Sequence, residues 1–381
     1  PPRSTLDRSS AASDVYKRQL LEEWAPKDYA EDFDNVGLLV GNPHSECSGV
    51  LITHDVLENV IDEVIFKSYN LIVCFHPIIF SGLKNLTGKT YVQRIVEKAV
   101  KNDIAIYAVH TALDNQINGV SYSLANALGL SNVQVLVPQK NTLKQLTTYV
   151  PKQNFSALLD KLYESGAGVL GQYDECSFIT DGRGSFRGNE NSQTYLGQKM
   201  IRKKVDEIQL NLIFKKHLEQ RVLQALFDNH PYEEVAYEIY SIENENREIG
   251  MGSVGELKNE ISEKEFLRLV GEKLDTKFLR HSAMIDRKIK KVAVLGGSGS
   301  FAISNAKQIK ADAFVTADLK YHDFFQGESQ LLLVDAGHYE TERFTKKLIH
   351  DYLIEKIPNF AIALTKCITN PVKYFSNGKK K

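Results

Sequence analysis

The chain has 381 residues, enough for two or three domains, and 47 Lys and Arg residues nearly balance 48 Asp and Glu residues. The net charge of −1 gives no general electrostatic attraction to nucleic acid or to an anionic membrane. Four scattered cysteines without CxxC spacing argue against a zinc knuckle or a disulfide framework, and no apolar run is long enough to span a membrane. We therefore expect a soluble, cytoplasmic protein.

The first 19 residues differ from the rest of the chain. They begin without Met and show almost no apolar periodicity. We interpret residues 1–19 as a non-native leader, such as a sequence-assembly scar, and exclude them from the fold prediction. From Leu20 the sequence predicts the end of a helix stopped by Pro26, and residues 34–41 predict a turn leading into a strand.

Three βα-like units follow, each built on a short apolar strand that ends in polar residues. The predicted strands cover residues 50–53, 71–74 and 104–109. Alternation of strands and helices at this spacing is typical of a largely parallel sheet with helices on both faces. This part of the chain therefore predicts an α/β domain.

The pattern changes near residue 135, where strands begin to alternate apolar and polar residues. Strands are predicted at 146–150, 207–214 and 235–242, with helices at 156–165 and 218–229. This order predicts a ferredoxin-like α+β module, residues 135–250, inserted into the first domain.

From residue 251 the α/β pattern returns. Strands are predicted at 292–295, 313–316, 331–334 and 360–364. We expect these strands to complete the N-terminal sheet. The α/β domain would then be discontinuous in sequence, formed by residues 20–134 and 251–381.

The stretch 331–343 joins a predicted buried strand, a turn and an amphipathic helix. His338 and Glu342 are four residues apart, so a helix that begins by His338 places both side chains on one face. An imidazole and a carboxylate at the carboxyl edge of a sheet make half of a metal site. The alternative is a helix start with an ordinary histidine and a capping acid.

Polar side chains follow five of the predicted strands, where ligand sites of open α/β sheets lie. They are His54, Asp55, His76, His110, Asp114, Thr316, Asp318, His322, Asp335, His338 and Glu342. Imidazole and carboxylate without thiolate favour Zn²⁺, Fe²⁺ or Mn²⁺. A carboxylate such as Asp114 can bridge two ions, and two-metal sites activate water for hydrolysis.

Five motifs carry a family resemblance. They are residues 34–41 (DNVGLLVG), 76–80 (HPIIF), 110–114 (HTALD), 316–322 (TADLKYH) and 335–342 (DAGHYETE). In this order they resemble the NGG-interacting-factor-three-like family of dinuclear-metal-centre proteins, also known as type 2 homologues of GTP cyclohydrolase 1. The resemblance runs from about Leu20 to Thr369-Asn370-Pro371. It implies a toroidal homohexamer with metal sites facing an internal cavity, and an inserted PII/CutA-like domain to which residues 166–168, 176–178 and 230–237 are similar.

The resemblance also implies two divalent ions per subunit (Zn, Fe or Mn), held by His76, Asp114, His338 and Glu342 with Asp114 or Glu342 bridging. The family usually has two consecutive histidines before the proline, but here Phe75 replaces the first. We expect His54 to supply the missing ligand, because neighbouring parallel strands bring their carboxyl ends side by side. The alternative is that His54 only hydrogen-bonds nearby and one ion is bound weakly or lost.

Together these residues favour a metal-dependent hydrolase in which metal-activated water attacks a nucleotide or phosphate-type substrate. His322, or a spare carboxylate, would transfer protons. The competing hypothesis is a non-catalytic, metal-dependent regulatory hexamer with a small-molecule-sensing insert. There is no P-loop, and residues 297–302 (GSGSFA), which formally fit a dinucleotide motif, are more typical of a tight turn whose amides face an anion. We expect no membrane partner.

Overall fold

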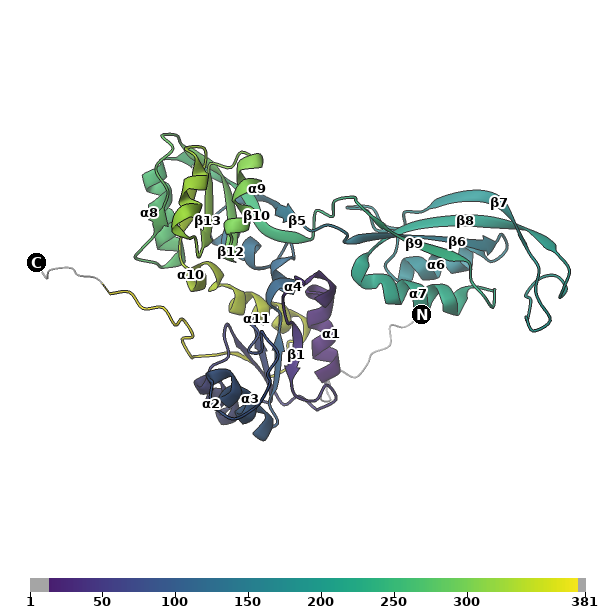
Figure 1. The fold of residues 1–381 in the computed structure, drawn as a ribbon, viewed down its shortest axis with the longest axis horizontal. Helices are drawn as coiled ribbons and strands as arrows, with labels where there is room; N and C mark the ends of the chain where they lie inside the picture. The colour runs from purple at the N-terminus through teal and green to yellow at the C-terminus, as the bar shows by residue number, and fades with distance from the viewer. Residues whose placement is uncertain (1–13, 376–381) are drawn as a thin grey trace, which may run out of the picture. The chain divides into compact units, whose positions relative to one another are not determined.

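The computed structural model describes residues 14–375, which divide into two compact units (Figure 1). Unit 2 covers Gln139–Asn246, and unit 1 consists of the chain on either side of it. The expected start of the insert at residue 135 falls inside β5 (Ser131–Pro138), which belongs to unit 1. Of the expected leader, residues 1–13 lie outside the described residues, and the remainder begins helix α1 (Asp14–Trp24).

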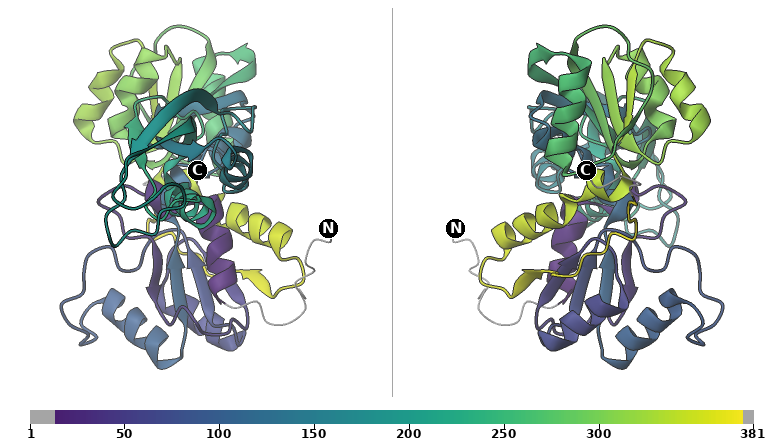
Figure 2. Two further views of the ribbon diagram at one scale, coloured as in Figure 1. Left: turned by 90° about the vertical axis from the view of Figure 1, so that its right-hand side faces the viewer. Right: turned by 90° about the vertical axis from the view of Figure 1, so that its left-hand side faces the viewer.

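Unit 1 contains a five-stranded sheet of order β1-β4-β3-β2-β15. The strands are β1 (Gly37–Val40), β2 (Val50–Thr53), β3 (Leu71–Cys74), β4 (Ala105–Ala108) and β15 (Ile362–Leu364). They run parallel except for β1, which pairs antiparallel with β4. Figure 2 shows the C-terminal strand beside the N-terminal ones, where β15 pairs with β2.

Helices cover both faces of this sheet. They are α1, α2 (Glu58–Phe66), α3 (Tyr91–Lys101) and α11 (Thr345–Lys356). Apolar residues of α2 and α3 share one buried cluster with the sheet, and those of α1 and α11 share another. This two-sided cover explains why every residue of β2, β3 and β4 is buried and why these strands are continuous apolar runs.

A second sheet of unit 1 has six strands in the order β11-β14-β13-β12-β10-β5. Besides β5 they are β10 (Gly250–Ile261), β11 (Arg280–His281), β12 (Ile289–Ser298), β13 (Ala313–Ala317) and β14 (Leu332–Asp335). The expectation that all C-terminal strands complete the N-terminal sheet is therefore wrong, since only β15 does so. Because β10 pairs antiparallel with both β5 and β12, it joins the later parallel strands to β5 in a sheet of their own.

Helices also pack on both faces of the six-stranded sheet. They are α5 (Val120–Ala127), α8 (Glu263–Leu274) and α9 (Ile303–Gln308). Leu124 of α5 and Phe266 of α8 lie in one buried cluster, and Ile303 of α9 lies in the other. Helix α8 starts at a capping box, in which Ser262 and Glu265 satisfy each other's main-chain N–H groups.

Unit 2 has the chain order strand, helix, strand, strand, helix, strand. Its elements are β6 (Leu143–Pro151), α6 (Phe155–Glu164), β7 (Phe178–Phe186), β8 (Lys203–Lys215), α7 (Glu219–Asn229) and β9 (Tyr237–Ile242). The antiparallel sheet has the order β7-β8-β6-β9, and alternate residues of β6 and β8 pack against the helices. This is a ferredoxin-like arrangement, so the predicted fold class, an α/β domain with an inserted ferredoxin-like module, is confirmed.

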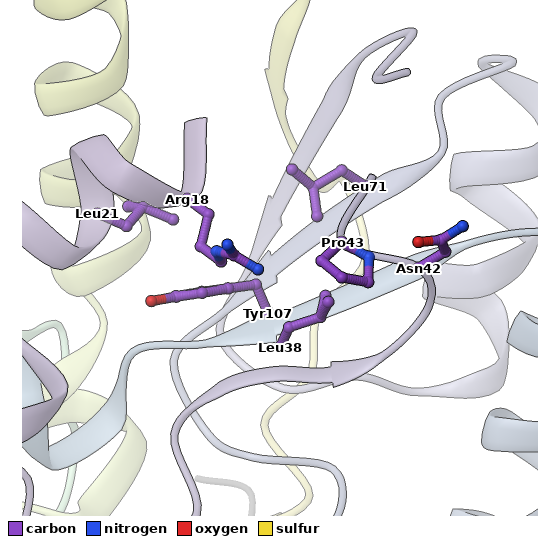
Figure 3. Close-up of a pocket in the computed structure, with 7 residues that line it drawn as sticks. All are labelled: Arg18, Leu21, Leu38, Asn42, Pro43, Leu71 and Tyr107. Carbon is purple, nitrogen blue, oxygen red and sulfur yellow. The ribbon is translucent and has the colours of Figure 1, made fainter. Parts of the chain in front are cut away.

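A small pocket lies where α1 packs on the five-stranded sheet (Figure 3). Its lining is Arg18, Leu21, Leu38, Asn42, Pro43, Leu71 and Tyr107. Leu71 begins β3, whereas the polar residues singled out from the sequence follow the other end of that strand. The pocket therefore belongs to the packing of α1. In the described part of the chain, no helix has the length and apolar character needed to cross a membrane.

Candidate metal centre

The strands of both sheets place polar side chains at one region of unit 1. In register, Thr53 of β2 lies beside Cys74 of β3, so His54 and His76 follow neighbouring strand ends. Helix α4 (His110–Asp114) follows β4, and helix α10 (His338–Glu342) follows β14 of the other sheet.

Gly337 makes the turn from β14 into α10. Its φ of +93° lies in the region that favours glycine, and a Cβ there would lie 2.3 Å from Oε2 of Glu340. Because α10 then begins at His338, the predicted one-turn spacing of His338 and Glu342 is observed.

Three imidazoles converge on one carboxylate oxygen. The Nε2 atoms of His338, His54 and His76 lie 3.1, 3.2 and 3.4 Å from Oε2 of Glu342. The Nε2 atoms of His76 and His338 are 3.4 Å apart. His76, His338 and Glu342 form one cluster whose ligand atoms lie within 4.8 Å of one another, and His54, Asp55 and His76 form a second.

Carboxylates hold the other ring nitrogen of two of these histidines. Nδ1 of His76 donates to Asp55 Oδ1 at 2.8 Å, and Nδ1 of His338 donates to Asp318 Oδ2 at 2.6 Å. Each bond orients its ring with Nε2 toward Glu342, and Nε2 is the ring nitrogen that can offer a lone pair to a cation once its proton has left. This is the arrangement by which proteins orient histidine ligands of metals.

His54 has a different environment. Its side chain is 3% exposed, and within residues 14–375 neither ring nitrogen has a partner in hydrogen-bond geometry. Oε2 of Glu342 is likewise buried without such a partner. Buried polar atoms are normally satisfied, so an imidazole nitrogen beside a carboxylate oxygen in this state is what a site for a cation requires. The residues present therefore fit a divalent metal.

Phe75 occupies the position where the family resemblance expects another histidine. It is fully buried, and its ring lies between those of His54 and His110, at centroid distances of 5.3 and 5.4 Å. The ring adds no ligand and packs apolar surface against His54 and His110. The structure thus places His54 where it can contribute an imidazole nitrogen, and its ligand role stays a prediction.

Asp114, the last residue of α4, lies close enough to interact with the charges of Glu342 and His76. Burial and the Glu342 carboxylate raise the pKa of Asp114 well above its ordinary value. Two adjacent carboxylates repel each other unless a proton or a cation lies nearby. Asp114 belongs to neither of the two clusters of converging ligand atoms, and the ligand role that the resemblance implies for it stays a prediction.

The histidines and Glu342 shift one another's protonation. Burial acts to lower the pKa values of His76 and His338, but nearby carboxylates outweigh it and raise them to about 10 and about 9. Burial acts to raise the pKa of Glu342, but the three imidazoles hold it well below its ordinary value. The cluster without a cation therefore retains protons that a divalent ion would displace.

A glycine turn forms one wall of the cluster. Gly297 has a φ of +67°, and a Cβ at this position would lie 2.2 Å from Oε1 of Glu342. Its N–H donates to Thr341 Oγ1 at 3.0 Å. Gly297 thus packs against the Glu342 carboxylate, and the expectation that the amides of the turn face a substrate anion stays a prediction.

His110 and Asp34 form a further pair beside the cluster. Nδ1 of His110 donates to Asp34 Oδ1 at 2.7 Å, and the His110 ring centroid is 5.3 Å from that of His76. Thr111 donates to the other Asp34 oxygen through its N–H and its hydroxyl. Burial acts to raise the pKa of Asp34, but these bonds hold it below the ordinary value.

Sequence patterns identified some of these residues as candidate site residues but did not predict their roles. Asp55, Asp318 and His110 all follow predicted strands, but their pairing depends on turns that the sequence does not specify. His322, the predicted proton-transfer residue, lies in η4 (Tyr321–Gly327) and is exposed. Its ring contacts among the described residues are with Tyr321 and Phe325, so its role stays a prediction.

The fold and the cluster define a protein whose unit 1 is an α/β domain with two sheets and a histidine–carboxylate cluster beyond their strand ends. A family profile described as Duf34/NIF3 (NGG1p interacting factor 3) matches residues 13–371. The chain belongs to this family, and the resemblance inferred from its motifs is confirmed.

Individual relatives agree with this assignment. A "GTP cyclohydrolase 1 type 2 homolog" of Bacillus subtilis is 42% identical over 338 residues, covering 87% of this chain and 90% of the relative. A protein of the same description from Staphylococcus epidermidis is 32% identical, covering 93% and 98%. The crystal structure of a Bacillus cereus protein related to NIF3 is 34% identical, with a TM-score of 0.84 and coverage of 96% and 100%.

Proposed function

We propose that unit 1 is a metal-dependent hydrolase whose two divalent ions are held by His54, His76, Asp114, His338 and Glu342. The observation that carries this proposal is the convergence of three Nε2 atoms on Oε2 of Glu342 within 3.4 Å. Nitrogen and oxygen donors without thiolate favour zinc, iron or manganese. Divalent ions at such sites lower the pKa of water and polarise the substrate.

The chain's own residues have separate tasks in this proposal. Asp55 and Asp318 hold His76 and His338 with Nε2 turned inward. Phe75 excludes water from the buried side of the cluster. Glu342 and Asp114 would supply carboxylate oxygens to hold the ions. His322, exposed in η4, or a spare carboxylate moves protons between solvent and substrate.

The substrate class is a nucleotide or another phosphate-type molecule. The description of the relatives as GTP cyclohydrolase 1 type 2 homologues supports a nucleotide, and hydrolysis of a phosphate ester is compatible with the same ligand set. Assembly as a homohexamer belongs to this proposal. It would give a native mass about six times the 43.0 kDa of the chain.

Metal content tests the ligand assignment. The protein is purified without chelator or metal-affinity resin, beside His338→Ala and His54→Ala, and metal per chain is measured. About two ions per chain, reduced in both variants, are expected. Unchanged content and affinity in His54→Ala would show that His54 is no ligand and that Phe75 has removed part of the centre.

Turnover tests the activity. GTP and a generic phosphodiester are assayed with added Mn²⁺ or Zn²⁺, and we expect turnover that Asp114→Asn abolishes. His322→Gln should lower turnover while metal content stays at the wild-type level. Metal binding without turnover of any such substrate would contradict the hydrolase.

The second candidate is a non-catalytic, metal-dependent regulatory hexamer. Two features favour it, namely Phe75 at the position where the resemblance leads us to expect histidine, and the separate ferredoxin-like unit 2. Binding of a small molecule to unit 2 that changes metal affinity in unit 1, with no turnover, would support this alternative. Turnover sensitive to Asp114→Asn would exclude it.

A further inference from the structure

The hydrogen-bonded pair Asp318 and His338 lies on two turns at the edge of the six-stranded sheet. Asp318 follows β13 and His338 follows β14, which is the parallel neighbour of β13. Both turns contain a residue with a positive φ, +56° at Asp318 and +93° at Gly337. The two side chains are partly open to water, with 50% of Asp318 and 38% of His338 exposed. Their contact therefore depends on how firmly the two turns are held.

The Asp335 carboxylate holds both turns. Asp335 is the last residue of β14 and is 6% exposed. Its Oδ1 accepts the Gly337 N–H at 3.1 Å, and its Oδ2 accepts the Leu319 N–H at 3.0 Å. Gly337 directly precedes His338, and Leu319 directly follows Asp318. One buried carboxylate thus fixes the main chain beside each member of the Asp318–His338 pair.

Arg280 is the charged partner of this carboxylate. It lies opposite Asp335 in the pairing of β11 with β14, and its guanidinium donates to Asp335 Oδ2. The same guanidinium donates to the Leu319 carbonyl at 2.8 Å. The N–H and the C=O of Leu319 are therefore both bound by the Arg280–Asp335 pair, which leaves the turn after Asp318 little freedom to move.

Asp335 is not placed to bind the metal itself. Each of its oxygens already accepts a main-chain N–H, and the adjacent Arg280 guanidinium repels a further cation. Among the described residues, the two clusters of converging ligand atoms do not include Asp335. Its effect on the centre must therefore pass through Asp318 and His338, whose side chains are joined at 2.6 Å.

We infer that Asp335 is a positioning residue of the metal centre. By fixing the turns that carry Asp318 and His338, it keeps Nε2 of His338 directed at Oε2 of Glu342, 3.1 Å away. The inference deepens the proposed function and rests on it for its metal readout. It assigns to the Arg280–Asp335 pair a task in the metal site besides its part in the sheet.

Asp312 offers a matched control at the other end of the same sheet. Its Oδ2 accepts the N–H groups of Lys290 and Lys291 at 3.0 and 2.8 Å, and Arg287 pairs with its Oδ1 at 3.4 Å. Asp312 directly precedes β13, so it lies at the end of that strand away from the site. Like Asp335, it is a carboxylate with two main-chain donors and an arginine partner.

The test compares Asp335→Ala with Asp312→Ala. Each variant removes one carboxylate and leaves two main-chain N–H groups and an arginine without it, so both should lower the free energy of unfolding. Denaturant titration measures this common effect. Dissociation constants for Zn²⁺ and Co²⁺ are measured by competition with a chromophoric chelator, and the absorption spectrum of the Co²⁺ form is recorded.

We expect Asp335→Ala to weaken metal binding by at least about tenfold, as loss of outer contacts of metal ligands does, and to change the Co²⁺ spectrum. Asp312→Ala should keep the wild-type spectrum and an affinity within about twofold of wild type. Wild-type affinity and spectrum in Asp335→Ala, or equal losses of affinity in the two variants, would overturn the inference.

Arg280→Gln keeps the test decisive if Asp335→Ala does not fold. The Arg280 side chain is 60% exposed, so its replacement is compatible with folding, and Arg287→Gln is the control. We expect Arg280→Gln to weaken metal binding about threefold, because the Asp335 contacts are loosened and not removed, and Arg287→Gln to have no effect. Equal affinities in Arg280→Gln and Arg287→Gln would then reject the positioning role.

A readout without metal separates this inference from the proposed function. The imidazole ¹⁵N and ¹H signals of His338 in metal-free protein report its hydrogen bond to Asp318. They should shift in Asp335→Ala and in Arg280→Gln, but not in the Asp312 and Arg287 variants. If wild-type protein binds no metal but these shifts occur, the positioning role stands and the metal-dependent function fails. Unshifted His338 signals in the Asp335 and Arg280 variants reject the positioning role.

Discussion

The Nε2 atom of His54 lies 3.2 Å from Oε2 of Glu342, although the two residues belong to opposite halves of unit 1. His54 follows β2 of the five-stranded sheet, and Glu342 ends the helix that follows β14 of the six-stranded sheet. Leaving such groups buried without compensation destabilises a fold. A cation held by both groups would offset this cost, so substitutions around the pair should change stability and metal affinity together.

Gly297→Ala should displace the Glu342 carboxylate. The new Cβ would lie 2.2 Å from Oε1 of Glu342, at a backbone φ of +67° that disfavours any side chain. We expect the free energy of unfolding to fall by about 2 kcal/mol and metal affinity to fall at least about tenfold. Chemical denaturation and metal competition measure the two effects.

Gly82→Ala is the control for Gly297→Ala. At Gly82 an added Cβ meets no atom within 4 Å, so stability should stay within about 0.5 kcal/mol of wild type. Wild-type metal affinity in Gly297→Ala would mean that the carboxylate can move without consequence and is no ligand.

Asp114→Asn should leave the metal-free protein at least as stable against unfolding as wild type, but should reduce the stability that added metal provides. Repulsion from Glu342 contributes to the raised pKa of Asp114, so the neutral amide relieves it in the absence of metal. We expect the metal-free variant to be as stable as wild type or more stable by about 1 kcal/mol. Added Mn²⁺ or Zn²⁺ should then raise the unfolding temperature of wild type much more than that of the variant.

Thermal unfolding with and without metal measures this crossover. Asp103→Asn, an exposed substitution after α3, should leave both curves unchanged. Equal stabilisation of wild type and Asp114→Asn by the ion would exclude Asp114 from the ligand set.

Local sequence patterns predicted the helices and strands better than they predicted which strands pair with one another. The runs Val50–Thr53 and Leu71–Cys74 were predicted with the bounds observed, because each is a short apolar run between turn residues. Nothing local distinguishes a buried strand of one sheet from a strand of another. The assignment of β12, β13 and β14 to a second sheet depends on the pairing of β10 with β5, which are distant in sequence.

The candidate site shows the same limit. The spacing of His338 and Glu342 implied their contact, because helix geometry is regular over one turn. The bonds from Asp55 to His76 and from Asp318 to His338 depend on non-helical turns, and Asp318 itself has a positive φ of 56°. Such turns are set by tertiary contacts. The sequence therefore identified the two carboxylates as candidate site residues but could not predict which histidines they bond.

Asp34→Asn should destabilise unit 1. The Asp34 side chain is fully buried and accepts hydrogen bonds from His110, Thr111 and the main chain of Asn35. An amide in its place presents N–H groups to donors and leaves His110 without a charged partner. We expect a loss of about 3 kcal/mol in the free energy of unfolding, measured by denaturant titration.

The exposed neighbour Asp32 provides the control for Asp34→Asn. Asp32→Asn should change stability by no more than about 0.5 kcal/mol. A similarly small effect of Asp34→Asn would show that the His110–Asp34 pair contributes little to the fold.

Unit 2 should become less stable as the pH falls below neutral because of His230. This residue is 8% exposed; its Nε2–H donates to Tyr149 O at 3.0 Å, and its Nδ1 accepts the Tyr232 N–H at 3.1 Å. Burial lowers the pKa of His230 below its ordinary value. The unfolded state, with a pKa near 6.5, therefore binds the proton more readily. The stabilisation that neutral, buried His230 contributes to unit 2 is fully present above about pH 6.5. It is lost as the pH falls through the folded-state pKa of His230.

Hydrogen-exchange protection factors of peptides from β6 and β9 between pH 5 and 8 measure this loss within the full chain. Protonation at Nδ1 removes the acceptor of the Tyr232 N–H, so protection should fall toward pH 5 in wild type. In His230→Gln this fall should disappear, with lower protection at every pH. His44→Gln, at an exposed position of unit 1, should keep the wild-type pH dependence. The same fall in His230→Gln as in wild type would assign the pH dependence to another group.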